Sequence, residues 1–231
     1  MRLIRHLPHS APARPTAVAI GNFDGLHRGH RALVEACTAR APELAPAMLC
    51  FEPLPRTFFA PERPVPRVMK LRDRVRVASA LGVELLAVLR FDRAFSMRSP
   101  AGFARDVLAA GLSARRVVVG EDFRFGHRAA GDVDALRQFG RELGFDVEAI
   151  PPVVDADGRR ISSTRLRAAL AEGDLDRAAA LLGRRYRISG RVLRGKSLGR
   201  DLGFPTVNLR VAEPPALTGI CAVRVHGAGL Q

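Results

Sequence analysis

Two histidines inside a glycine-rich segment are the residues of this sequence best suited to chemistry. The segment 21–30 reads GNFDGLHRGH and carries His27 and His30. Glycines let a backbone approach a phosphate chain closely. At the start of a helix, a spacing of three places both imidazoles on one face, beside free N–H groups that favour anions. The pattern predicts a site that stabilises charge on a transferring phosphoryl group. A glycine-rich turn with two surface histidines is the plain alternative.

A second polar segment, ISSTRLR at 161–167, has the residue types of a phosphate-binding helix start. The hydroxyls of Ser163 and Thr164 can cap a helix and bind a phosphate oxygen. Arg167 can reach the same anion with a forked, permanently charged group. An ordinary helix cap with a solvated arginine is the alternative. In the first segment, Asp24 is expected to orient either a Mg²⁺ ion or the glycine-rich turn.

Strands and helices alternate along residues 16–182, which predicts an α/β fold. The alternation implies βαβ units and a parallel sheet that is covered on both faces. We expect strands at 16–20, 47–51, 85–89, 116–119 and 147–150, and helices at about 30–39, 71–81, 100–110, 132–143, 162–172 and 175–182. Ligands of such sheets bind beyond the carboxyl ends of the strands. The segments 21–30, 51–55 and 120–126 each follow a strand and should therefore converge on one crevice.

The pattern changes near residues 183–185, where we place a domain boundary between 1–183 and 184–231. Residues Tyr186–Val192 and Val207–Leu209 alternate like antiparallel strands around a glycine-rich loop, and Cys221–Val225 resembles a further strand. We therefore predict a partial antiparallel β-barrel after the α/β domain.

Composition limits the partners of the chain. The 231 residues carry a net charge of +14, with a pI of about 11.4. The arginines are scattered, and one tyrosine and no tryptophan leave few stacking platforms, which argues against specific nucleic-acid binding. The positive field would still attract anionic ligands. The three cysteines lack metal-ligand spacing, and no signal peptide or membrane span is visible, so we expect a cytoplasmic protein, monomeric or weakly homo-oligomeric.

Together these segments resemble the bacterial bifunctional riboflavin kinase/FMN adenylyltransferase (FAD synthetase) family. Residues 21–30 look like the signature of the HxGH nucleotidyltransferases, the superfamily of this family. FEPLPR at 51–56 is similar to the family's FEPxPR segment, VVGEDFRFG at 118–126 to its second nucleotidyltransferase motif, and ISSTRLR to its ISSTxxR motif. The resemblance covers essentially the whole chain, with the motifs in the family's order, and implies a Rossmann-like nucleotidyltransferase domain.

The resemblance implies that AMP passes from Mg·ATP to FMN, giving FAD and pyrophosphate. It assigns catalysis to His27, His30 and Arg167, and ATP binding to Gly21, Asn22, Phe23, Asp24, Gly29, Ser163 and Thr164. It places Pro53, Pro55, Asp122, Phe123, Phe125 and Gly126 in the flavin and nucleotide crevice. A strand-end turn with two core phenylalanines is the alternative for the last four of these.

The segment 195–208, GKSLGRDLGFPTVN, resembles the riboflavin kinase motif GxxxGRxxGFPTxN. By resemblance, glycine N–H groups cradle ATP phosphates and two side-chain oxygens bind Mg²⁺, those of Thr206 and Asn208. The implied residues are Gly195, Lys196, Gly199, Arg200, Gly203, Thr206 and Asn208. The sequence stops at Gln231, whereas the family's pattern continues through further strands and a helix with an acidic base, and Cys221 stands where the family has tyrosine. We therefore expect riboflavin phosphorylation to be incomplete or absent.

Three other functions remain open at this stage. The enzyme could use a different phosphorylated acceptor, such as pantetheine phosphate or a cytidylyl acceptor. The chain could be a non-catalytic fragment that binds flavin or nucleotide, or a basic nucleic-acid binder.

Overall fold

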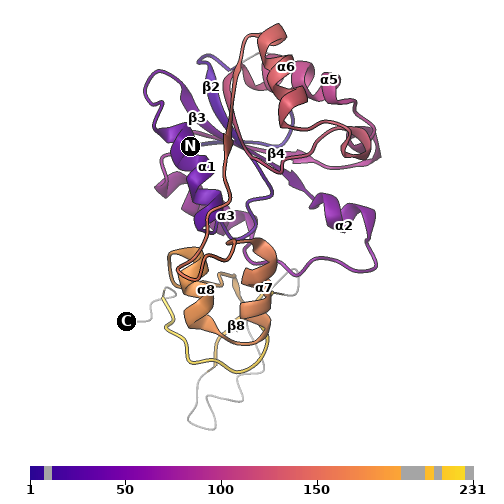
Figure 1. Ribbon diagram of the computed structural model, residues 1–231. Helices are drawn as coiled ribbons and strands as arrows, with labels where there is room; N and C mark the ends of the chain where they lie inside the picture. The colour runs from indigo at the N-terminus through magenta and orange to yellow at the C-terminus, as the bar shows by residue number, and fades with distance from the viewer. Residues whose placement is uncertain (8–11, 194–205, 211–214, 227–231) are drawn as a thin grey trace.

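The computed structural model describes residues 1–7, 12–193, 206–210 and 215–226, and a parallel six-stranded sheet forms its centre (Figure 1). The strand order is β1-β4-β3-β2-β5-β6. The strands are β1 (Arg2–Ile4), β2 (Thr16–Ile20), β3 (Ala45–Glu52), β4 (Leu85–Arg90), β5 (Ala114–Gly120) and β6 (Asp146–Ile150). The predicted α/β class with a parallel sheet is therefore confirmed.

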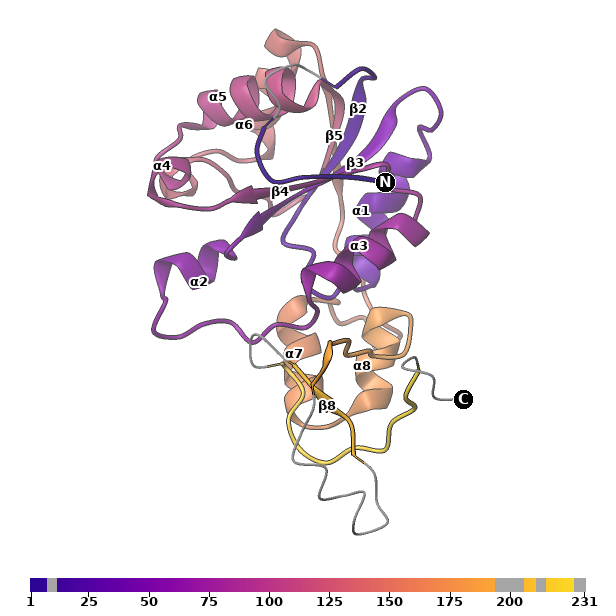
Figure 2. The ribbon, with the colours of Figure 1, turned by 180° about the vertical axis from the view of Figure 1, so that it is seen from behind.

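Helices cover both faces of this sheet, as Figures 1 and 2 show from opposite sides. Alternate strand residues supply the two cores: Val18 and Ile20 of β2 face one, and Ala17 and Ala19 face the other. The helices α1 (Arg28–Thr38) and α3 (Leu71–Ala80) pack on one face, and the π-helical stretch η1 (Phe103–Gly111) and α6 (Val133–Leu143) on the other. Shorter elements are α2 (Pro55–Phe59), α4 (Arg93–Ser96), α5 (Pro100–Gly102) and the 3-10 turn η2 (His127–Ala129).

The strand order places a topological switch point beside β2. The chain runs from β2 to β3 and β4 on one side and then crosses to β5, which pairs with β2 on the other side. Crevices at such points hold the ligands of parallel sheets. The segments 21–27 and 121–126 leave the carboxyl ends of β2 and β5, so they border this crevice.

A helical hairpin lies beneath the carboxyl edge of the sheet. It consists of α7 (Ser163–Ala171) and α8 (Leu175–Leu182), whose residues Leu166, Leu170 and Leu181 share a small third core (Figure 1). Ser162 and Asp174 cap these helices by accepting backbone N–H groups three residues ahead. This hairpin carries the predicted phosphate-binding segment to the switch point.

The predicted antiparallel domain is visible in the described residues only as a two-stranded sheet. It pairs β7 (Val192–Leu193) with β8 (Asn208–Leu209). Of the strand expected over Tyr186–Val192, only Val192 lies in a strand, and Cys221–Val225 forms no strand. The side chain of Val223 is 73% exposed, and a strand without a neighbour gains no ladder hydrogen bonds.

Four short elements and one helix type differ from the sequence expectations. The structure adds β1, α2, α4 and η2, and most of the helix expected over 100–110 is π-helical. Short elements carry too few residues to show a period, and the shift from i→i+4 to i→i+5 hydrogen bonds over one or two turns leaves no distinct signal in so short a segment. No helix in the described parts of the chain is long and apolar enough to cross a membrane.

Candidate active site

The two histidines predicted to act in catalysis lie stacked at the start of α1. Their ring centroids are 3.8 Å apart at an interplanar angle of 14°. His27 is the N-cap residue, and its Nδ1 accepts the backbone N–H of His30 at 3.2 Å. A neutral His27 must therefore carry its proton on Nε2, where the N–H is available to a phosphate oxygen.

Burial and nearby arginines keep this histidine pair neutral. Burial lowers the pKa of His27 to about 4, and the positive charges of Arg160, Arg167 and Arg184 add to the effect against an opposing pull from Asp24. Burial also lowers the pKa of His30, with smaller contributions from His27, Arg74 and Arg167. The site thus combines neutral hydrogen-bond donors with fixed positive charge, an arrangement suited to a polyphosphate.

The backbone of the glycine-rich loop is tightly constrained. Gly25 has φ +97°, and a Cβ there would lie 2.9 Å from side-chain atoms of Val68 and Leu166. Gly29 leaves room for the His27 ring, since a Cβ would lie 3.2 Å from it. Phe23 and Leu26 also have positive φ, at 49° and 45°, a conformation uncommon outside glycine and frequent at functional sites. These glycines therefore serve close packing at the loop.

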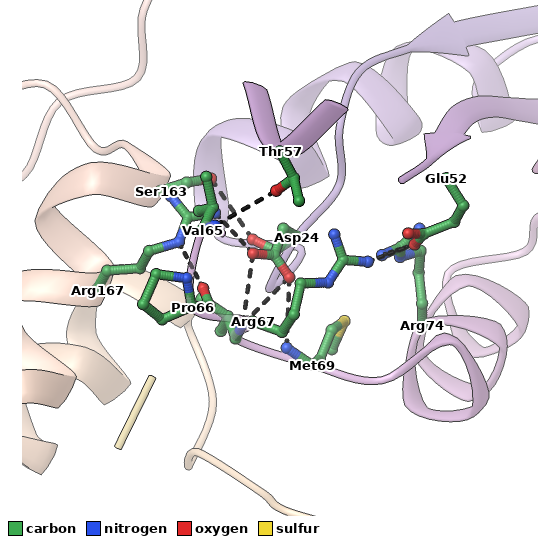
Figure 3. A network of polar contacts seen from close by, with 11 residues as sticks. Asp24, Glu52, Thr57, Val65, Pro66, Arg67, Met69, Arg74, Ser163 and Arg167 are labelled. Carbon is green, nitrogen blue, oxygen red and sulfur yellow. Dashed lines mark hydrogen bonds and ion pairs between the residues drawn. The ribbon is translucent and has the colours of Figure 1, made fainter. Parts of the chain in front are cut away.

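Asp24 joins three separate parts of the chain (Figure 3). Its fully buried carboxylate accepts Nη2–H of Arg167 at 2.6 Å and the backbone N–H groups of Val68 and Met69 at 3.2 and 3.4 Å. Arg167 also donates Nε–H to the carbonyl of Pro66 at 2.9 Å. The carboxylate oxygens are thus occupied by Arg167 and by the loop at Val68 and Met69. This favours a role for Asp24 in orienting the glycine-rich turn over a role in holding Mg²⁺.

An ion-pair network continues from this point to the end of β3 (Figure 3). Arg67, next to the loop that Asp24 holds, pairs with Glu52. Glu52 also accepts Nη2–H of Arg74 at 3.1 Å, and Arg74 donates Nη1–H to Cys50 Sγ at 3.3 Å. Arg74 is fully buried on α3. The network ties the segment before Pro53 to the segment that holds Arg167.

Aromatic side chains form a continuous cluster along the carboxyl ends of β3, β4 and β5. Phe51 of β3 contacts Phe95 at a centroid distance of 5.2 Å, and Phe103 contacts Phe125 at 5.5 Å. Phe95 and Phe103 close the chain of contacts at 6.3 Å. The aromatic cluster comprises Phe51, Phe58, Phe59, Phe91, Phe95, Phe103, Phe123 and Phe125.

Comparison with known proteins places this architecture in a family. A family model described as FAD synthetase matches residues 9–165, and one described as riboflavin kinase matches residues 182–230. The chain is 40% identical to the bifunctional riboflavin kinase/FMN adenylyltransferase of Escherichia coli K12, over 99% of this chain and 74% of that protein.

The chain belongs to the bifunctional riboflavin kinase/FMN adenylyltransferase family.

Another family member, from Pseudomonas fluorescens, is 42% identical over 97% of this chain and 73% of its own length. A crystal structure described as a macrolide-efflux protein from Streptococcus pneumoniae superposes with a TM-score of 0.78 at 28% identity, over 94% of this chain and 70% of that one. The fold is therefore shared along nearly the whole chain.

Within this family fold, the structure brings several predicted residues together and leaves others apart. Ser163 Oγ lies 3.5 Å from the carbonyl of Asp24, and Phe23 contacts His30 at a centroid distance of 5.2 Å. Asp122 reaches the histidines indirectly, through an ion pair of 2.7 Å with Arg160. Asn22, Pro53 and Thr164 are exposed, Gly21 and Pro55 are partly exposed, and Gly126 turns with φ +75° against Pro100.

The residues predicted for the second nucleotide site are described only in part. Thr206 and Asn208 are exposed, and Asn208 lies in β8. Gly195, Lys196, Gly199, Arg200 and Gly203 lie outside the described residues. Within the described parts of the chain, no three His, Cys, Asp or Glu residues gather as a metal site.

Sequence reasoning missed the arginines that surround the histidines. Arg74 comes from the apolar face of α3, Arg160 precedes α7, and Arg184 follows α8. A charged residue at an apolar helix position, as at Arg74, was the one available signal.

Cavities of about 390 and 290 Å³ lie near α3 and residues 184–189, and neither is lined by the histidine pair.

Proposed function

We propose that this chain transfers the adenylyl group of ATP to FMN, with FAD and pyrophosphate as products. The observation that carries the proposal is the stacked, neutral pair of His27 and His30, which lies among three arginines at the switch point of the sheet. Membership of the family supports the choice of ATP and FMN, since the relatives are named FMN adenylyltransferases.

In the proposed reaction, a phosphate oxygen of FMN attacks the α-phosphorus of ATP. The bond to the β-phosphate oxygen breaks, and pyrophosphate leaves with the electron pair. His27 donates its Nε2–H to a phosphate oxygen, and Arg167 holds the growing negative charge together with the hydroxyls of Ser163 and Thr164. Most of the rate enhancement is positioning and electrostatic stabilisation, as in phosphoryl transfer generally.

Magnesium enters this proposal as part of the substrate Mg·ATP. The carboxylate of Asp24 is already occupied by Arg167 and two backbone N–H groups, so the triphosphate itself is proposed as the principal ligand. Chelation of Mg²⁺ should stop turnover, and its return should restore it.

The aromatic cluster supports a flavin-binding role for the loops after β3 and β5. A flat aromatic ring system is well matched to stacked and edge-on phenylalanines. Phe123 and Phe125 stack at a centroid distance of 5.5 Å beside the switch point. We propose that Pro53, Pro55, Asp122, Phe123, Phe125 and Gly126 shape the flavin side of the crevice.

The region matched by the riboflavin kinase model is proposed to hold a second nucleotide. Thr206 and Asn208, two residues apart, offer the hard oxygens that Mg²⁺ prefers. The predicted antiparallel barrel and the boundary at 183/184 stay predictions, as do the cytoplasmic location and the monomeric or weakly homo-oligomeric state. FMN formation from riboflavin and ATP is the measurement that shows whether this region phosphorylates riboflavin.

The proposal is tested by incubating the folded protein with FMN, ATP and Mg²⁺ and separating the flavins by chromatography. FAD should accumulate with an equal amount of pyrophosphate. Pantetheine phosphate and cytidylyl acceptors serve as controls and should give no product. A folded sample that forms no FAD would overturn the proposal and leave non-catalytic binding of flavin or nucleotide as the alternative.

A further inference from the structure

Arg184 lies directly after α8, outside every motif in the sequence, yet its side chain reaches the catalytic loop. One guanidinium nitrogen, Nη2, donates to the carbonyl of Gly25 at 2.6 Å, and Nη1 donates to the carbonyl of Leu26 at 3.0 Å. Nη1 also lies 3.4 Å from the carbonyl of Leu182. Gly25 and Leu26 are the two residues that immediately precede His27, so we call these two contacts the Arg184 brace.

The brace acts on a part of the backbone that would relax without support. Gly25 and Leu26 both have positive φ, at 97° and 45°, and for leucine this conformation costs free energy. The peptide group after Leu26 sets the direction in which the chain enters α1, whose N-cap is His27. Two hydrogen bonds from one planar guanidinium therefore hold the orientation on which the histidine ring depends.

The surroundings of Arg184 make a purely structural role a poor explanation. Its guanidinium donates to backbone carbonyls, and among the described residues no carboxylate pairs with it. Burial and the charge of Arg31 lower the pKa of Arg184. A half-buried charge without an acidic partner is costly for folding, and such groups are concentrated at functional sites.

We propose that Arg184 is a positioning residue for adenylyl transfer, which fixes the Gly25 and Leu26 carbonyls and thereby sets His27 against the reacting phosphate. His27 lies in the part matched by the FAD synthetase model, residues 9–165, whereas Arg184 lies in the part matched by the riboflavin kinase model, residues 182–230. A residue from the second region thus completes the site of the first. This inference rests on the proposed function for its kinetic readout.

The test compares Arg184→Gln with Arg185→Gln in the full chain. Arg185 is the exposed neighbour in the same segment, and the matched variant removes the same charge without touching the loop. Misplacing a reacting group by about 1 Å can cost about 100-fold in rate, so we expect kcat of Arg184→Gln to fall about 10- to 100-fold, with KM for ATP changed by less than about 3-fold. Arg185→Gln should stay within about 2-fold of the wild type in both.

Arg184→Lys separates position from charge. Its ammonium group keeps the positive charge and can reach one carbonyl, so part of kcat should return. The charges facing His27 are those of Arg160 before α7, Arg167 on α7, Arg184 and the opposing Asp24, beside its stacked neighbour His30. The acid limb of the kcat profile should therefore move to higher pH in Arg184→Gln and stay near the wild-type position in Arg184→Lys.

Hydrogen exchange of a peptide covering residues 21–30 supplies a readout that is independent of turnover. Exchange should be faster in Arg184→Gln than in the wild type and unchanged in Arg185→Gln. A wild-type protein that makes no FAD would count against the proposed function, and the exchange result would then decide the brace alone. Equal kcat and equal exchange in the two glutamine variants would overturn the inference. A rise in KM for ATP with kcat unchanged in Arg184→Gln would also overturn it. If Arg184→Gln does not fold, Arg184→Lys is compared with Arg185→Lys by kcat and by hydrogen exchange. A lower kcat and faster exchange in Arg184→Lys would support the inference, and equal values in the two lysine variants would overturn it.

Discussion

Replacing Asp24 by asparagine should destabilise the fold far more than the loss of an ordinary surface charge. Asp24 is fully buried, Arg167 retains 18% side-chain exposure, and the two are joined at 2.6 Å. Breaking a buried ion pair by removing one partner costs about 3–5 kcal/mol. The asparagine carbonyl can still accept the backbone N–H of Val68, so we expect the lower end, a loss of about 3 kcal/mol in the free energy of unfolding.

Urea unfolding followed by far-UV circular dichroism measures this loss. In a chain of this length, about 3 kcal/mol corresponds to a fall in Tm of roughly 6–12 °C. Glu84→Gln is the matched control, since it removes an exposed pair with Arg14 whose side chains are 50% and 45% exposed. Exposed pairs contribute about 0–1 kcal/mol, so Glu84→Gln should lie close to the wild type. If Asp24→Asn lost no more than Glu84→Gln, Asp24 would not be the junction that joins α7 to the catalytic loop.

Four further predictions concern the histidine, the turn after β5 and the aromatic cluster. His27→Asn keeps an acceptor for the α1 cap but lacks the imidazole ring, so kcat should fall about 100- to 1000-fold while KM for ATP changes less than about 3-fold. A rise in KM for ATP as large as the fall in kcat would contradict a transition-state role. Folding lowers the pKa of His27 from 6.5 to about 4, so the unfolded chain takes up the proton at higher pH than the folded chain. Protonation therefore favours unfolding as the pH falls. Relative to His27→Asn, the wild type should lose about 3 kcal/mol of unfolding free energy between pH 6.5 and pH 4. Gly126→Ala would place a Cβ 2.7 Å from Pro100 and should cost about 2–4 kcal/mol of unfolding free energy, measured in urea. The control Gly158→Ala is also at positive φ but has no atom within 4 Å, so it should cost about 1 kcal/mol. Equal losses would show that backbone strain, and not the contact with Pro100, sets the cost. Phe123→Ala should raise KM for FMN several-fold and leave KM for ATP unchanged, and an unchanged KM for FMN would place the flavin elsewhere.

The sequence was sufficient to predict the elements that carry strong periodicity. The strand at Thr16–Ile20 is fully buried, and the helix at Val133–Leu143 is framed by Asp132 and Gly144, so their types and bounds follow from local signals. The same holds for the convergence of the loops after β2 and β5, which follows from parallel pairing. By contrast, β1 has three residues and gains its stability from pairing with β4, which no local pattern reveals.

The histidine pair of the candidate site could be predicted, but its electrostatic surroundings could not. His27 and His30 are close in sequence, so helical spacing alone places their rings together. Arg74, Arg160 and Arg184 reach the pair from three separate parts of the chain, over separations of 44 to 157 residues, and only the folded chain brings them there. The role of Asp24 depended on Val68 and Met69, whose backbone N–H groups carry no signal in the sequence.

The most direct test of the account is to follow the α-phosphate of ATP through the reaction. ATP labelled at the α-phosphate and ATP labelled at the γ-phosphate are each incubated with FMN, Mg²⁺ and the protein, and flavins are separated from pyrophosphate. The account predicts that the α-label appears in FAD and the γ-label in pyrophosphate, and that His27→Asn suppresses both at equal protein concentration. An α-label that remains outside the flavin, with the wild-type protein folded, would contradict it.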